Sequence, residues 1–187
     1  MDPARVLAPV VSLFAVLAYR VVGRARLGPD ADWVERLHRE WFPAVAAPFQ
    51  GWLPGTTARE IEPREFAMTL AAPLEAVEDD LWAAGFRRHP LARVKTRDGV
   101  ASAGSWVLLD HLLARRQLHV MLFPDEDEGV THVYAHEEYA SLNPLVAYAH
   151  YTGHGQSAAA GVARVEALFD RSGSSEGTPR RQVRATK

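Results

Sequence analysis

Eight histidines are the residues of this chain with the widest chemical range, because cysteine is absent. They stand at positions 38, 89, 111, 119, 132, 136, 150 and 154. An imidazole titrates near neutral pH and is a common metal ligand. The lack of cysteine excludes a disulfide framework, a thiolate zinc site and a cysteine nucleophile. No G-x-S-x-G, H-E-x-x-H or P-loop occurs either, so no catalytic residue and no cofactor is predicted.

Two predicted strands gather several of these histidines on one face of a sheet. Side chains alternate between the faces of a strand, and the strands 117–123 and 130–138 each carry an apolar row on one side. The other side carries five polar or aromatic candidates for ligand binding: His119, His132, Tyr134, His136 and Glu138. Matching the two apolar rows makes His119 the direct neighbour of Tyr134, and it places His132 and His136 on the diagonals.

A metal or ligand site on this face would need His119, His136 and Glu138, or a residue from elsewhere in the chain. His132 and His136 cannot share one metal, because four residues of a strand separate them by roughly 13 Å. The alternative is a solvated or helix-covered face whose histidines make ordinary hydrogen bonds. No compact metal-binding spacing is present, so no metal is predicted.

A second group of candidates lies in residues 148–155. His150 and His154 would share a helix face if the helix continued, but Gly153 is expected to end it. His150 would then stabilise the negative end of that helix. The stretch 153–158 also fits G-x-G-x-x-A before a helix, which makes Gly153, Gly155 and Gln156 anion-binding candidates. A dinucleotide site would need a preceding strand and a βαβ unit, and the predicted order of elements offers neither.

The elements that position these residues indicate one α+β domain over residues 59–170. Strands are predicted at 64–71, 91–96, 103–109, 117–123 and 130–138, and an acidic hairpin loop is predicted at 124–129. Helices are predicted from Pro73 to Gly85, from Asn143 to Gly153, and over 157–170. This order predicts a mostly antiparallel sheet of about five strands with helices on one face. Residues 171–187 lack apolar periodicity and are predicted to be a disordered basic tail.

Residues 1–28 are predicted to form an apolar helix that associates with a membrane. A helix over residues 3–27 would be roughly 37 Å long, enough to cross a bilayer core of about 30 Å. Arg20, Arg24 and Arg26 follow the apolar stretch, so the positive-inside rule predicts that the body is cytoplasmic. The alternatives are a helix in the core or on the surface, which would make the protein cytoplasmic, and a cleavable signal peptide.

Residues 29–58 are predicted to hold an amphipathic helix, over about 31–42, and a connector rich in proline and tryptophan. The tryptophans could form an interfacial aromatic belt or pack on the body. The charge is distributed unevenly along the chain. Residues 1–27 carry a net charge of +3 and residues 171–187 carry +4, which leaves −9 for residues 28–170 because the total is −2. This acidic balance argues against a nucleic-acid partner.

Three stretches of the body carry a resemblance. They are Gly104-Ser105-Trp106, the run Arg116-Gln117-Leu118-His119-Val120-Met121-Leu122-Phe123, and the run Val133-Tyr134-Ala135-His136-Glu137-Glu138-Tyr139. Together they resemble a family of small uncharacterised haloarchaeal proteins and, more remotely, the C-terminal domain of LssY-type membrane-associated proteins. The resemblance covers about residues 62–170 and includes no catalytic signature. It implies the fold and transfers no site.

Two functions from different classes follow from these observations. The first is a membrane-associated binding or scaffolding domain, whose partner is membrane lipid or a membrane protein. The second is a histidine- or metal-assisted hydrolase that uses the sheet face of His119, Tyr134 and His136. The sequence does not specify the substrate or the oligomeric state.

Overall fold

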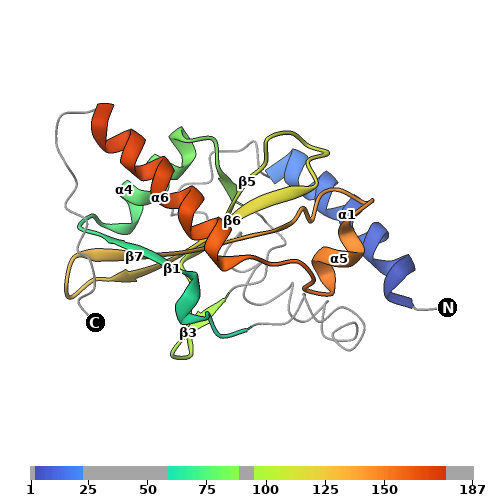
Figure 1. The fold of residues 1–187 in the computed structure, drawn as a ribbon, viewed down its shortest axis with the longest axis horizontal. Helices are drawn as coiled ribbons and strands as arrows, with labels where there is room; N and C mark the ends of the chain where they lie inside the picture. The colour runs from blue at the N-terminus through green and yellow to red at the C-terminus, as the bar shows by residue number, and fades with distance from the viewer. Residues whose placement is uncertain (1–2, 23–58, 89–94, 176–187) are drawn as a thin grey trace.

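The computed structural model describes residues 3–22, 59–88 and 95–175 (Figure 1). Its centre is an antiparallel sheet in the order β1-β7-β6-β5-β2. The strands are β1 (Phe66–Leu70), β2 (Arg87–Arg88), β5 (Gly104–Leu108), β6 (Arg116–Asp125) and β7 (Val130–Tyr139). The helices are α1 (Pro3–Val22), the 3-10 turn η4 (Pro63–Glu65), α4 (Leu74–Ala83), α5 (Ala147–Tyr151) and α6 (Ala158–Ser175). A separate hairpin joins β3 (Thr96–Arg97) to β4 (Val100–Ala101). The predicted α+β class is confirmed.

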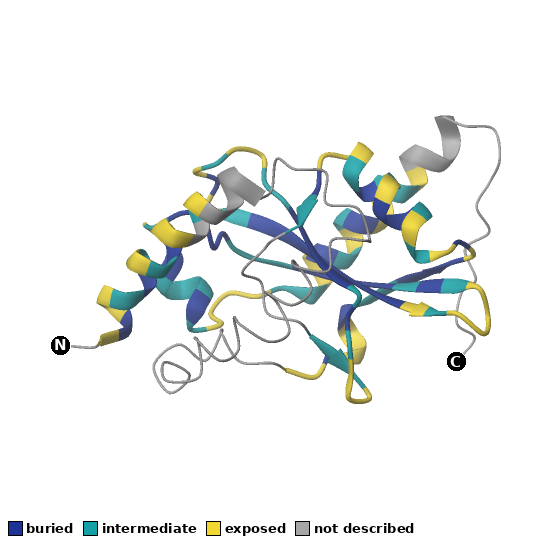
Figure 2. Ribbon diagram, turned by 180° about the vertical axis from the view of Figure 1, so that it is seen from behind, coloured by how far each residue is buried: buried dark blue, intermediate teal, exposed yellow. Residues whose placement is uncertain are grey.

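The main core lies between the sheet and the helices α4 and α6 (Figure 2). Leu118, Val120 and Leu122 of β6 are fully buried there and pack with Val165 of α6. Burying a leucine side chain contributes about 1.5–3 kcal/mol. The apolar row therefore fixes which face of β6 points at the helices, and the histidines take the other face, as the alternation predicts.

The pairing of β6 with β7 differs from the prediction by two residues. His119 lies directly opposite His136, and Met121 lies opposite Tyr134. Strand β6 continues into the predicted hairpin loop as far as Asp125, which pairs with Val130 at the predicted start of β7. A hairpin's turn sets its register, and a two-residue shift keeps every side chain on its face. The predicted neighbour of His119 was therefore wrong, although the predicted face was right.

Several element boundaries also differ from the prediction. Helix α6 continues to Ser175, so residues 171–175 belong to a helix and not to the tail. Helix α5 begins at Ala147, because the side chain of Asn143 ties loops together instead of opening a helix. Its amide nitrogen donates to the carbonyl oxygens of Leu113 and Ala114. The strands β2 and β4 and the turn η4 were not predicted. The predictions for residues 23–58, 91–94 and 176–187 lie outside the described residues.

Helix α1 packs on the body through small side chains. Ala4 and Ala8 are buried against Ala147 and Tyr151 of α5. Among the described residues, no helix has the length and apolar character needed to cross a membrane. The predicted single-pass span is therefore not supported.

Helix α6 lies directly on strand β7 at one point. A Cβ atom added to Gly161 would fall closer than 3.0 Å to the backbone N, Cα and C atoms of His136. Only glycine permits two backbones to approach so closely. This contact fixes α6 against the strand that carries the central histidine.

Candidate functional site

A buried cluster of imidazoles and carboxylates lies on the sheet face away from α4 and α6. It consists of Glu65, His119, His136 and Glu138, which we call the His-Glu centre. The strands place His119 on β6 and His136 and Glu138 on β7, and Glu65 ends the turn η4. Glu65 and His136 are each 1% exposed, and His119 is 7% exposed. Charged groups are buried only when they are paired or ligated, so this cluster needs a physical explanation.

Three groups of the centre face one another at nearly equal distances. His119 Nδ1 lies 3.2 Å from His136 Nε2 and 3.3 Å from Glu138 Oε1. His136 Nε2 lies 3.5 Å from Glu138 Oε2. Two imidazole nitrogens and one carboxylate therefore form a triangle that could hold a metal ion.

Each of His119, His136 and Glu138 is hydrogen-bonded to a further side chain outside this triangle. The Nδ1 atom of His136 lies 2.6 Å from Glu65 Oε1 and donates to it. The Nε2 atom of His119 is hydrogen-bonded to the hydroxyl of Ser105. The amide of Gln117 donates to Glu138 Oε1 at 2.8 Å. These contacts leave His119 Nδ1 and His136 Nε2 directed at each other.

The charges in the centre shift its pKa values in opposite directions. Burial favours neutral Glu65, but the hydrogen bond and charge of His136 outweigh burial and lower its pKa to about 2. Burial also opposes ionisation of Glu138, yet nearby His150 and His136 hold its pKa well below the usual range. The pKa of His136 is raised, because the charges and hydrogen bonds of Glu138 and Glu65 exceed the effect of burial. Burial lowers the pKa of His119. These shifts favour protonation of His136 over protonation of His119.

Helix α5 brings His150 to the edge of the centre. Its Nδ1 atom donates to the carbonyl oxygen of Tyr139 at 2.9 Å and lies 3.4 Å from Glu138 Oε2. The next residue, Tyr151, stacks edge-on against the His150 ring and packs on α1. Burial and the charge of Glu138 raise the pKa of Tyr151. His150 stands in the last turn of α5, as predicted.

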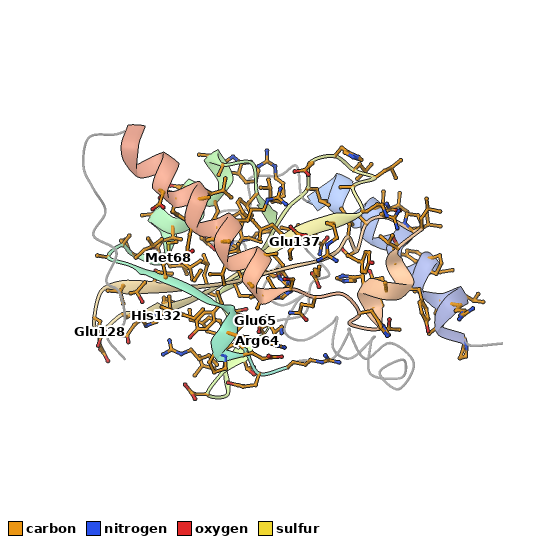
Figure 3. The ribbon with its side chains drawn as sticks, in the orientation of Figure 1. Arg64, Glu65, Met68, Glu128, His132 and Glu137 are labelled. Atoms are coloured by element: carbon orange, nitrogen blue, oxygen red, sulfur yellow. The ribbon has the colours of Figure 1, made fainter. Side chains whose placement is uncertain are left out.

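Other predicted candidates lie apart from the centre. His132 is hydrogen-bonded to Thr69 and lies toward the hairpin turn that carries Glu128 (Figure 3). Tyr134 packs edge-on against the rings of Phe66 and Phe123. His154 is exposed and hydrogen-bonded to Thr152. The structure therefore brings together His119, His136, Glu138 and His150, and not the other three.

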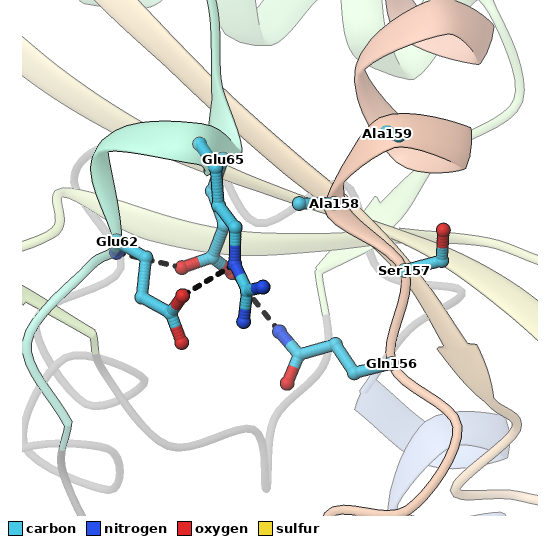
Figure 4. A pocket seen from close by; sticks show the side chains of 7 residues that line it. Glu62, Glu65, Gln156, Ser157, Ala158 and Ala159 are labelled. Atoms are coloured by element: carbon cyan, nitrogen blue, oxygen red, sulfur yellow. Dashed lines mark hydrogen bonds and ion pairs between the residues drawn. The ribbon is translucent and has the colours of Figure 1, made fainter.

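The anion-binding candidates line a different environment from the one predicted. A pocket of about 310 Å³ lies between η4 and the start of α6 (Figure 4). Gln156 lines it and donates to Glu65 Oε1 at 3.0 Å. Glu62, Arg64 and Glu65 line it as well, and Arg64 is paired with Glu62, so the negative charge of Glu65 opposes an anion there. Gly153 and Gly155 adopt positive φ angles in the loop before α6, and the carbonyl of Gly155 accepts from Arg116.

Sequence reasoning missed three residues that support the centre. Glu65, Gln117 and Ser105 each contact one of its corners, yet none was a candidate. For Gln117 and Ser105 a signal existed, since both alternate onto the histidine face of predicted strands. Glu65 lies 71 positions before His136, and only the tertiary fold brings them together.

The depressed pKa of Glu65 predicts an acid-labile protein. A carboxylate with a lowered folded pKa stabilises the fold above its ordinary value of 4.5, and that stability is lost as the pH falls toward 2. We expect metal-free protein to lose on the order of 3 kcal/mol of unfolding free energy over this interval because of Glu65. Urea unfolding at a series of pH values from about 5 to about 2 measures the loss, because this interval spans the ordinary and the lowered pKa of Glu65.

Two variants show whether Glu65 causes this loss. Glu65→Gln is expected to flatten the pH dependence, whereas Glu128→Gln in the exposed hairpin turn leaves it unchanged. Equal slopes for the wild type and Glu65→Gln would contradict the assignment.

Fold and site together define a small α+β domain with a buried centre of two histidines and two glutamates. Comparisons with protein-family models, curated proteins and solved structures found no significant match. The function is therefore argued from the centre itself, and the resemblance to the haloarchaeal family stays a prediction.

Proposed function

We propose that the domain binds a divalent metal ion, Zn²⁺ in preference, through His119 Nδ1, His136 Nε2 and the Glu138 carboxylate. The separations of 3.2, 3.3 and 3.5 Å between these groups carry the proposal. Ligands about 2.0–2.1 Å from a tetrahedral zinc ion are about 3.3–3.4 Å from one another. The 3.2 Å between the two imidazole nitrogens matches this spacing, and one ligand atom from each of His119, His136 and Glu138 can be chosen so that all three lie within 4.8 Å of one another.

The contacts behind the ligands support the same proposal. Metal-bound histidines usually donate their second N–H group to a carboxylate, hydroxyl or carbonyl, which orients the ring. Glu65 accepts from His136 in this way, and the hydroxyl of Ser105 is in place to accept from His119. The amide of Gln117 holds the Glu138 carboxylate.

Metal-assisted hydrolysis is the reaction class that this ligand set supports best. Two histidines and one carboxylate leave a fourth zinc position for water, as in catalytic zinc sites. Zinc would lower the pKa of that water and supply a nucleophile near neutral pH. The residues proposed for this reaction are His119, His136 and Glu138. Tyr134, the third member of the face predicted from sequence, packs away from them.

Metal titration tests the proposal directly. We expect metal-free wild-type protein to bind one Zn²⁺ per chain in isothermal calorimetry and to unfold at higher temperature with bound metal. At a free zinc concentration a hundred times the Kd, binding adds about 2.7 kcal/mol to the unfolding free energy. Mg²⁺ serves as the control ion, because it prefers oxygen ligands in an octahedron. Absence of stoichiometric zinc binding would identify the centre as a hydrogen-bonded network only.

We also propose membrane association as a second function, as a binding or scaffolding domain at the cytoplasmic face of the cell membrane. A different surface supports it. Helix α1 exposes a row of large apolar side chains on the side away from α5. The N-terminal 27 residues also carry a net charge of +3, which favours anionic lipid. Membrane lipid is the proposed partner, with a membrane protein as the alternative.

A further inference from the structure

Helix α1 has two faces of opposite character. Its large exposed side chains are Val6, Val10, Leu13, Phe14 and Leu17, which are between 43% and 64% exposed. At 100° per residue they fall within an arc of about 100°. Ala4, Ala8 and Ser12 are buried on the opposite side. The packing of α1 on α5 therefore fixes the direction in which the apolar arc faces. We call this arc the α1 stripe.

Two further exposed apolar residues lie at the same end of the molecule. Leu145 is 92% exposed and lies just before α5, which packs on α1 (Figure 1). Leu113 is 63% exposed, and its carbonyl accepts from Asn143 in the loop that carries Leu145. Among the described residues, only Val100 is a large exposed apolar side chain elsewhere. Exposed apolar residues thus concentrate at one end, as they do at docking sites.

We propose that the α1 stripe docks flat on an anionic lipid bilayer. This inference rests on the proposed membrane association and specifies the surface, the lipid charge and the orientation of the helix. A helix that lies in the interface needs an apolar face and nearby cationic residues, and it need not span the bilayer. That geometry agrees with the finding that no described helix could span one.

Charge selects lipid over a second copy of the chain as the occupant. Residues 1–27 carry +3, whereas residues 28–170 carry −9. Two copies docked through α1 would bring two acidic bodies together, which is unfavourable. An anionic bilayer also repels the acidic body, but docking through α1 brings the basic segment nearest to the bilayer. Each cation near that surface contributes about 1 kcal/mol, and salt screens the repulsion of more distant charges. Arg5 belongs to this segment, and its guanidinium lies 5.6 Å from the ring centre of Tyr148 on α5.

Vesicle sedimentation with the full chain tests the docking surface. We expect the wild type to bind vesicles of phosphatidylglycerol and phosphatidylcholine, more strongly than phosphatidylcholine alone, and less at high salt. The double variant Leu13→Glu, Phe14→Glu should lower the partition coefficient at least about tenfold, because two exposed apolar side chains that would enter the bilayer become charged. Val100→Glu, an equally exposed apolar site on β4, should leave binding unchanged.

Each other outcome overturns the inference in a distinguishable way. If the wild type binds vesicles and the double variant binds equally well, membrane association stands but the α1 stripe is not its surface. A wild type that binds no vesicle removes both proposals. A wild-type dimer that the double variant abolishes would show that the stripe joins two copies. A clearly lower unfolding temperature for the double variant and for Leu13→Ser would show that the chain itself covers the stripe.

Discussion

Replacing His136 with alanine is expected to lower the affinity for Zn²⁺ at least about a hundredfold. Loss of a residue that is hydrogen-bonded to a metal ligand already lowers metal affinity about 10–100-fold, and His136 is itself a proposed ligand. It is also the group that connects Glu65 to the triangle. The measurement is competition against a zinc chelator of known affinity, at one pH for all variants.

His132→Ala is the matched control for this experiment. His132 stands four positions earlier on the same strand, and its ring is hydrogen-bonded to Thr69 and not to the centre. We expect its zinc affinity to stay within about twofold of the wild type, well below the cost of a lost metal contact. Equal losses for the two variants would indicate general destabilisation and would contradict the assignment of His136.

Glu138→Gln separates ligation from folding. Alanine at position 136 leaves the carboxylate of Glu65 buried without its main partner, so the variant could lose stability as well. Glutamine at position 138 preserves side-chain size and contact with Gln117, but it removes the charge that a metal ion requires. Cobalt substitution gives an independent reading, since tetrahedral Co²⁺ absorbs far more strongly than octahedral Co²⁺. We expect the intense bands in the wild type and their loss in Glu138→Gln.

The sequence was sufficient to place the ligand side chains on one face, because strand alternation is local. The apolar rows of β6 and β7 point at the helices, so His119, His136 and Glu138 must point away. Their direct juxtaposition depended on the register. The register depended on how far β6 continues into an acidic stretch that composition alone assigns to a loop. A local rule therefore found the face, and the turn geometry decided which residues meet.

The rest of the centre depends on contacts between distant segments. Glu65 reaches His136 only because β1 pairs with β7, which brings the end of η4 beside that strand. His150 reaches Glu138 only because α5 folds back against β7. No periodicity in either segment encodes these approaches. The same holds for α1, whose apolar run predicts a helix but does not indicate that α5 is its partner.

Gly161→Ala is expected to reduce the unfolding free energy by up to about 2 kcal/mol. Alanine improves helix propensity by about 1 kcal/mol, which alone would stabilise α6. Here, however, the new methyl group would fall closer than 3.0 Å to three backbone atoms of His136. Neither a helix backbone nor a central strand can yield as a flexible side chain can, so α6 must move away from β7. Overpacking in a rigid core costs about 1–3 kcal/mol and occasionally more, so the expected net effect is destabilising.

A substitution at an exposed site on α6 serves as the control for the clash with the His136 backbone. Ala163 is exposed on α6, and Ala163→Ser is expected to change stability by no more than about 0.5 kcal/mol. Thermal unfolding of both variants measures the difference, at roughly 2–4 °C per kcal/mol for a chain of this size. Because the strained contact is with the backbone of His136, Gly161→Ala should also weaken zinc binding, which Ala163→Ser should not. Wild-type stability with unimpaired zinc affinity in Gly161→Ala would mean that α6 does not lie against β7 as described.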